Sequence, residues 1–329
     1  MIKIIRFGGV KLILLLSLSL LMCLAACGGA IDPDPFDRFA SSAVELRDSA
    51  DEVLSHQYDW ARERFIQDTV KGDSISGEKV QRLILENVPG VPFAWKAQRP
   101  PILFLSAGEF RESVRTLNDA LVDYAGLLIE LAVSGHIDQD EFTVAASGIN
   151  SGIQDASKAL GLTDKDREIG LFSTAATELF RQYLQSKSKK KLRDALNGNQ
   201  ENIRALSDAL SDAMRLASQH FFAEYSSRSL SLALMLAPDN SMSDNQKQDR
   251  VVELIELNEL LIGRLDVLRR LHDSYESLPG ANRDLAASLE KGQHGLTSIY
   301  RIRDNAKFLR EVYKDLGSEQ SNEPNDSDN

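Results

Sequence analysis

Cysteine is scarce in this chain of 329 residues, which contains only two, at positions 23 and 27. No cysteine follows Cys27, so the rest of the chain cannot close a disulfide or build a zinc site from cysteine pairs. It also lacks a thiolate nucleophile. The fold after Cys27 must therefore depend on packing rather than on covalent cross-links.

Proline is also rare, with nine residues in all, and four of them fall in the segment 88–105. Because proline breaks helices, the remaining chain is open to long ones. No stretch keeps the alternation of polar and apolar residues that marks a strand. These absences favour an all-α fold.

Recognisable catalytic and cofactor motifs are missing as well. The sequence has no glycine-rich nucleotide loop, no Gly-x-Ser-x-Gly elbow, no EF-hand loop and no cysteine–histidine cluster. We therefore expect a protein that is not an enzyme and has no cofactor other than attached lipid. A hydrolase that uses scattered carboxylates is the alternative that one sequence leaves open.

The first residues have the order of an export signal. Lys3, Arg6 and Lys11 precede the apolar run 12–21, and small residues then lead to Cys27. The apolar run is shorter than the roughly 20 residues that span a bilayer. This order predicts a cleaved signal rather than a stable transmembrane anchor.

Leu24-Ala25-Ala26-Cys27 resembles the lipobox of bacterial lipoproteins. The resemblance implies that the Cys27 thiol receives a diacylglyceryl group, that residues 1–26 are removed, and that the new amino group is acylated. Gly28 after the cysteine implies the outer membrane, facing the periplasm, in a cell with two membranes. An ordinary signal with an incidental cysteine is the alternative.

Cleavage would leave 35 basic residues against 49 acidic ones, a formal charge of −14. So acidic a body is a poor general binder of nucleic acid. The partners expected are the membrane, through the lipid, and another envelope protein.

The mature chain divides by composition. Residues 27–36 form a lipidated tether, residues 37–316 a helical body, and residues 317–329 a polar tail expected to be disordered. The segment 87–105 is the best candidate for a boundary within the body.

Helical spacing is strong in the body. Steps of three and four residues run along one face, at Phe110, Val114, Leu117, Leu121, Tyr124, Leu128 and Leu131. Two later segments carry similar stripes, interrupted at Arg264 and Arg303, and look like long coiled-coil-like partners joined near Pro279-Gly280. We expect an elongated antiparallel bundle of about eight helices, at 37–70, 76–87, 106–134, 139–160, 164–186, 189–236, 244–278 and 281–316.

Capping patterns support these starts. Ser106 with Glu109 and Ser243 with Gln246 fit the capping box, and Asp138 with Glu141 and Thr163 with Asp166 are weaker matches.

Three histidines have an acid one helical turn away: His56 with Glu52, His220 with Glu224, and His272 with Glu276. Such pairs can bind a metal inside a bundle, and they motivate the alternative of a small-ligand or metal-binding protein. Acids are so common here that chance explains most of the pairs, and the preferred interpretation is ordinary surface histidines.

The segment 88–105 combines prolines with the aromatic residues Phe93, Trp95 and Phe104. Long loops with aromatic residues often bind partners, although a connector that covers the end of the bundle is the simpler interpretation.

Small residues at Ala145, Gly148 and Gly152 share one helical face and predict close helix packing. The basic run 187–193 is read as a solvated helix start, with contact to anionic lipid as the alternative.

Together these observations favour a membrane-tethered, non-enzymatic structural, adaptor or interaction protein of the envelope.

Overall fold

Nine α-helices and no strand make up the part of the chain that the computed structural model describes, which is residues 31–71, 103–134, 137–161, 170–236, 242–292 and 295–320. The predicted all-α class is confirmed. The helices are α2 (Asp34–Lys71), α5 (Leu103–Ile129), α6 (Gln139–Ala159), α7 (Thr174–Ser186), α8 (Lys189–Gly198), α9 (Gln200–Met235), α10 (Asp244–Glu276), α11 (Leu278–Lys291) and α12 (Thr297–Gln320). A π-helical turn, η1 (Glu130–Ser134), extends α5.

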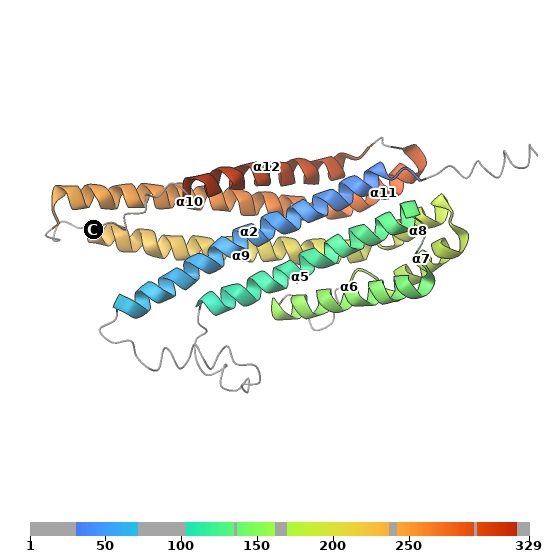
Figure 1. The fold of residues 1–329 in the computed structure, drawn as a ribbon, viewed down its shortest axis with the longest axis horizontal. Coiled ribbons are helices and arrows are strands. Elements are labelled where there is room, and N and C mark those ends of the chain that lie inside the picture. The colour runs from blue at the N-terminus through green and yellow to red at the C-terminus, as the bar shows by residue number, and fades with distance from the viewer. Residues whose placement is uncertain are drawn as a thin grey trace, which may run out of the picture.

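The long helices lie side by side and form an elongated antiparallel bundle (Figure 1). α2 packs along α5, and α9 packs along α10. α6 lies against α5, while α12 lies against α2 and α10. The shorter helices α7, α8 and α11 gather at one end of the bundle, and the α9–α10 pair extends past α12 at the other (Figure 1).

The predicted stripe on α5 faces one hydrophobic core. Leu117, Leu121 and Leu128 are fully buried, and of the stripe only Phe110 is half-buried. The same core includes residues of all nine helices, so α2 and α5, on either side of the candidate boundary 87–105, share it. Within the described residues no helix is both long and apolar enough to cross a membrane.

Several predicted helices are broken where the sequence pattern continues. The single helix expected at 189–236 is two, because the buried Asn199 ends α8 and begins α9. The helix expected at 281–316 is also two, divided after Gly292, whose φ of 65° is costly for residues with a side chain. Of the helix expected at 164–186, residues 164–169 lie outside the described residues, and the described helix begins at Thr174, with the Ser173 hydroxyl capping it.

The last two long segments do meet at a helix boundary near Pro279-Gly280, at Ser277, but the chain does not reverse there. Pro279 and Gly280 lie in the first turn of α11, which starts directly after α10. The chain reverses between α11 and α12 instead (Figure 1). Proline fits here because the first turn of a helix leaves backbone N–H groups without partners anyway.

The capping predictions have mixed outcomes. Full capping boxes form at Asp138 with Glu141 and at Ser243 with Gln246. Ser106 is not a cap, because α5 already begins at Leu103. Thr163 with Asp166 and the helix expected at 76–87 lie outside the described residues, and α12 continues beyond residue 316 to Gln320.

A buried polar network joins the helix breaks to the core. The Tyr124 hydroxyl donates to Asn282 Oδ1 over 2.9 Å, and the Asn282 amide donates to the backbone oxygen of Leu196 over 2.8 Å. The Tyr275 hydroxyl donates to Asn118 Oδ1 over 2.9 Å. Burial raises the pKa of both tyrosines, so they stay neutral donors. The network fixes α5, α8, α10 and α11 in register.

Candidate functional site

A cavity of about 620 Å³ lies where α2, α5, the end of α6 and α9 meet. Its walls are mainly apolar, because α2, α5 and α9 present alanines and larger hydrophobic residues there. The lining residues are Gln57, Ala61, Ala107, Glu109, Phe110, Ala159, Leu160, Leu216, His220, Ala223, Glu224 and Ser227. This volume is within the range of cavities that bind small molecules.

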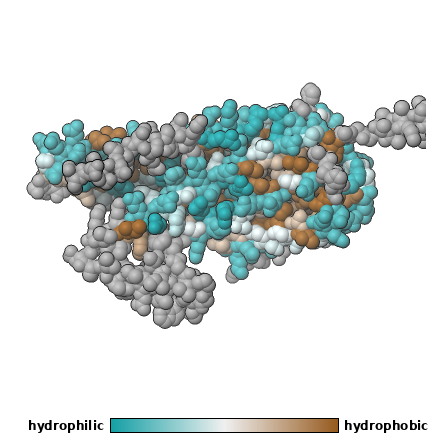
Figure 2. All heavy atoms as spheres, in the orientation of Figure 1, coloured by the Kyte–Doolittle hydropathy of each residue, from teal (hydrophilic) through white to brown (hydrophobic). Residues whose placement is uncertain are grey.

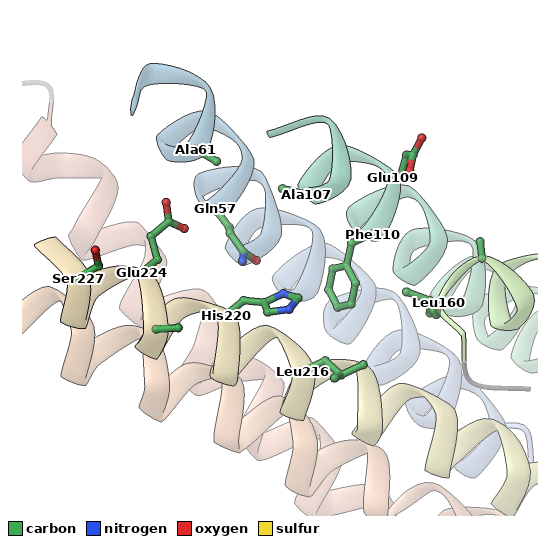
Figure 3. A pocket seen from close by; sticks show the side chains of 12 residues that line it. Gln57, Ala61, Ala107, Glu109, Phe110, Leu160, Leu216, His220, Glu224 and Ser227 are labelled. Carbon is green, nitrogen blue, oxygen red and sulfur yellow. The ribbon is translucent and has the colours of Figure 1, made fainter. Parts of the chain in front are cut away.

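One side of the cavity is polar. Gln57 of α2 is only 7% exposed, and His220 and Glu224 lie on successive turns of α9. The His220 ring meets the Phe110 ring edge-on, with centroids 6.3 Å apart. Figure 3 shows the imidazole pointing between Phe110 and the Gln57 amide. An amide and an imidazole beside an aromatic face can orient one polar group of a bound molecule.

The predicted pair His220 and Glu224 thus lies at a cavity. The Glu224 carboxylate points away from the imidazole (Figure 3), and no described third ligand joins the pair. Metal sites in helical bundles need several convergent ligands. The cavity is better suited to an organic molecule.

The second predicted pair, His272 and Glu276, does come together. His272 Nε2 lies 3.8 Å from Glu276 Oε1, and its Nδ1 lies 3.4 Å from Asp273 Oδ1. All three groups are on the surface of α10, with the carboxylates more than half exposed. Exposed acidic groups beside a histidine are common in proteins without a bound metal, and contacts in so solvated a position contribute little to stability.

Other predicted site residues lie outside the described residues. They include the lipidation site Cys27 and two loop aromatics, Phe93 and Trp95. Phe104 lies in the first turn of α5 rather than in a loop.

A shallower hollow of about 530 Å³ runs between α5 and α6, where Figure 2 shows hydrophobic residues on the surface. Two of the small residues predicted to share one helical face, Ala145 and Gly148, line this hollow. A Cβ at Gly148 of α6 or at Gly126 of α5 would meet nothing within 4 Å. Close packing is therefore the wrong explanation for Gly148, whereas Gly152 does approach Thr116.

The cavity was not predictable as a unit. Phe110 was visible in an apolar stripe and His220 in a histidine–acid pair, but nothing in the sequence joins them to Gln57, which is distant in the chain. Only the crossing of α2 and α5 over α9 brings the three together (Figure 1).

Comparison with known proteins adds no relative: the chain matches no protein-family model, and no curated protein or solved structure matches it.

Proposed function

We propose that this chain is a lipid-anchored envelope protein, not an enzyme, whose helical body binds a small organic molecule in the cavity between α2, α5 and α9. The observation that carries the proposal is the cavity itself, with its apolar wall and its Gln57–His220 polar side. The ligand class that fits is an apolar body with one hydrogen-bonding group.

A fluorescent apolar probe tests this proposal. N-phenyl-1-naphthylamine should bind the purified full-length protein saturably at one site. Ala223→Phe fills the cavity from α9 and should weaken binding at least tenfold. The matched control is Ala175→Phe, at an exposed position of α7, which should bind as the parent does. Equal binding by both variants, or no saturable binding, would reject the cavity as the site.

The anchor is tested separately. Cys27→Ala removes the only thiol of the predicted lipobox, so cells fed an alkyne analogue of palmitate should label the parent protein and leave the variant unlabelled and uncleaved. Labelling of the variant at the parent level would disprove the lipid assignment. The result does not depend on the cavity.

A second candidate function is binding of another envelope protein by the α9–α10 pair. Large hydrophobic residues are exposed on both helices, with Leu230 at 62%, Ile255 at 53% and Ile262 at 61%. Large apolar residues left exposed to water can mark an interaction surface. Absence of saturable probe binding in the cavity would favour this function over the first.

A further inference from the structure

Two buried polar atoms on neighbouring helices lack hydrogen-bond partners. They are the hydroxyl of Tyr225 on α9 and the Nη1 of Arg264 on α10. Tyr225 is fully buried and Arg264 is half-buried. Among the described residues only Ser157 Oγ, on α6, shares this condition. Buried donors without partners are rare because each loses its hydrogen bonds to water.

The two orphaned atoms belong to neighbouring side chains, because the Arg264 guanidinium lies over the Tyr225 ring. The guanidinium carbon of Arg264 is 5.9 Å from the centre of the Tyr225 ring and 5.6 Å from that of Phe221. Trp60 of α2 stacks on Tyr225 with the ring centres 4.7 Å apart. The contacts with two ring faces attract the cation but leave its N–H group unbonded.

The positive charge of Arg264 is not balanced by a described carboxylate. Nearby arginines are paired: Arg228 bonds to Glu253 over 3.0 Å, and Arg270 bonds to Asp266 over 2.9 Å. The structure records no ion pair for Arg264 among the described residues.

The titratable neighbours include the carboxylates of Asp59 and Glu224, and among the described residues neither forms a recorded ion pair with Arg264. Burial lowers the pKa of His56, the positive charge of Arg264 lowers it further, and Asp59 acts in the opposite direction. Burial raises the pKa of Tyr225. The positive charges of Arg264 and Arg228 lower this pKa, and the negative charge of Glu224 raises it. The Tyr225 hydroxyl therefore remains a neutral donor beside an unpaired cation.

We propose that Arg264 and Tyr225 bind the carboxylate of a small organic acid between α9 and α10, with Trp60 and Phe221 beside its apolar part. A guanidinium N–H and a phenol O–H provide two donors to an anion, and one positive charge matches one carboxylate. A cation is disfavoured by the same charge. Arg264, Tyr225, Trp60 and Phe221 do not line the cavity described above, so this site is independent of the proposed function.

The fluorescence of Trp60, which stacks on Tyr225, can be used to measure anion binding at this site. In the full-length Trp95→Phe protein, Trp60 is the only tryptophan, and its fluorescence should report events at Tyr225. Sodium acetate, phosphate and chloride would each be titrated at constant ionic strength, maintained with sodium isethionate. Acetate should produce a saturable change at lower concentration than either inorganic anion.

Three variants decide the assignment. Arg264→Gln should weaken acetate binding at least tenfold, and Tyr225→Phe, which removes one oxygen and keeps the ring, should weaken it at least threefold. Arg228→Gln is the matched control, because it also removes an arginine beside Trp60, and should bind acetate as the parent does. Circular dichroism would verify the fold of each.

The absence of a saturable acetate response would overturn the proposal, as would equal responses in Tyr225→Phe and the parent. Tighter binding of phosphate than of acetate would overturn the carboxylate as the ligand class. Because Tyr225→Phe preserves the shape of the core, the test stands even if Arg264→Gln does not fold.

Discussion

Asn282 of α11 shows how one amide can hold distant parts of the chain together. Its side chain is 1% exposed, accepts from Tyr124 of α5, and donates to the backbone of Leu196 at the end of α8 and to the side chain of Gln200 at the start of α9. No apolar side chain could satisfy these partners. Its position in the second turn of α11 therefore reflects tertiary structure rather than helix propensity.

We expect Asn282→Leu to lower the free energy of unfolding by about 2–4 kcal/mol, because the buried Tyr124 hydroxyl would lose its acceptor and the Leu196 carbonyl would lose one of its donors. Tyr124→Phe should cost about 1–3 kcal/mol, since it removes a hydroxyl that donates to Asn282 and accepts from Asn199. Chemical denaturation with guanidinium would measure both. The exposed Asn258→Leu is the control, and a loss no larger than the control's would contradict this role for the amide.

At the scale of the element, the glycines of the helices differ in what surrounds them. Gly126 lies in the interior of α5 with open space at its Cβ position. Gly280 lies in the first turn of α11, where a Cβ would come within 2.9 Å of Ser298 Cβ at the start of α12. Gly126 therefore lowers the stability of α5 without a packing benefit, whereas Gly280 permits α11 and α12 to approach closely.

Substitution by alanine should therefore have opposite effects at the two glycines. Gly126→Ala should raise the free energy of unfolding by about 0.5–1 kcal/mol, because alanine loses less backbone entropy in a helix. Gly280→Ala should lower it by about 1–3 kcal/mol through overpacking against Ser298. Thermal and denaturant unfolding would measure both, and the same sign of change at both positions would contradict the packing described.

At the scale of the whole molecule, burial is uneven along the bundle. The buried residues of α10 are concentrated between Val267 and Tyr275, with Leu257 the only one nearer its start. Beyond Tyr225, α9 buries only Leu232. The extended end of the α9–α10 pair therefore has few core contacts, and such regions open locally at a lower free energy than the core.

Amide hydrogen exchange followed by mass spectrometry should show this difference. Amides in 246–256 should exchange at least tenfold faster than those in 267–276, because local opening of the first segment disturbs little of the core. The 117–128 segment of α5 serves as an internal reference for full protection. Equal protection of the two α10 segments would show that the bundle opens only as a unit.

The sequence contained the fold class and most of the helices, because an apolar stripe and a capping box are local patterns. Asp138 and Ser243 were found for that reason. The helix break at Asn199 could not be predicted from the sequence, because the buried Asn199 amide donates to the hydroxyl of Tyr124, which is far away in the chain. The interruption of an apolar stripe at Arg264 was visible, but its significance required the neighbouring Tyr225 and Trp60.

The position of the first helix has a consequence for the orientation of the molecule. α2 starts at the end of the bundle that α11 and α8 close (Figure 1), and α8 begins with three lysines, at 189–191. A lipid on Cys27 would thus bring this end, with its positive charges, toward the headgroups. Gln57 lies about 35 Å along α2 from Asp34, at a rise of about 1.5 Å per residue. With the bundle upright on such an anchor, the cavity would open away from the membrane surface, and the proposed ligand would arrive by diffusion through water rather than laterally through the bilayer.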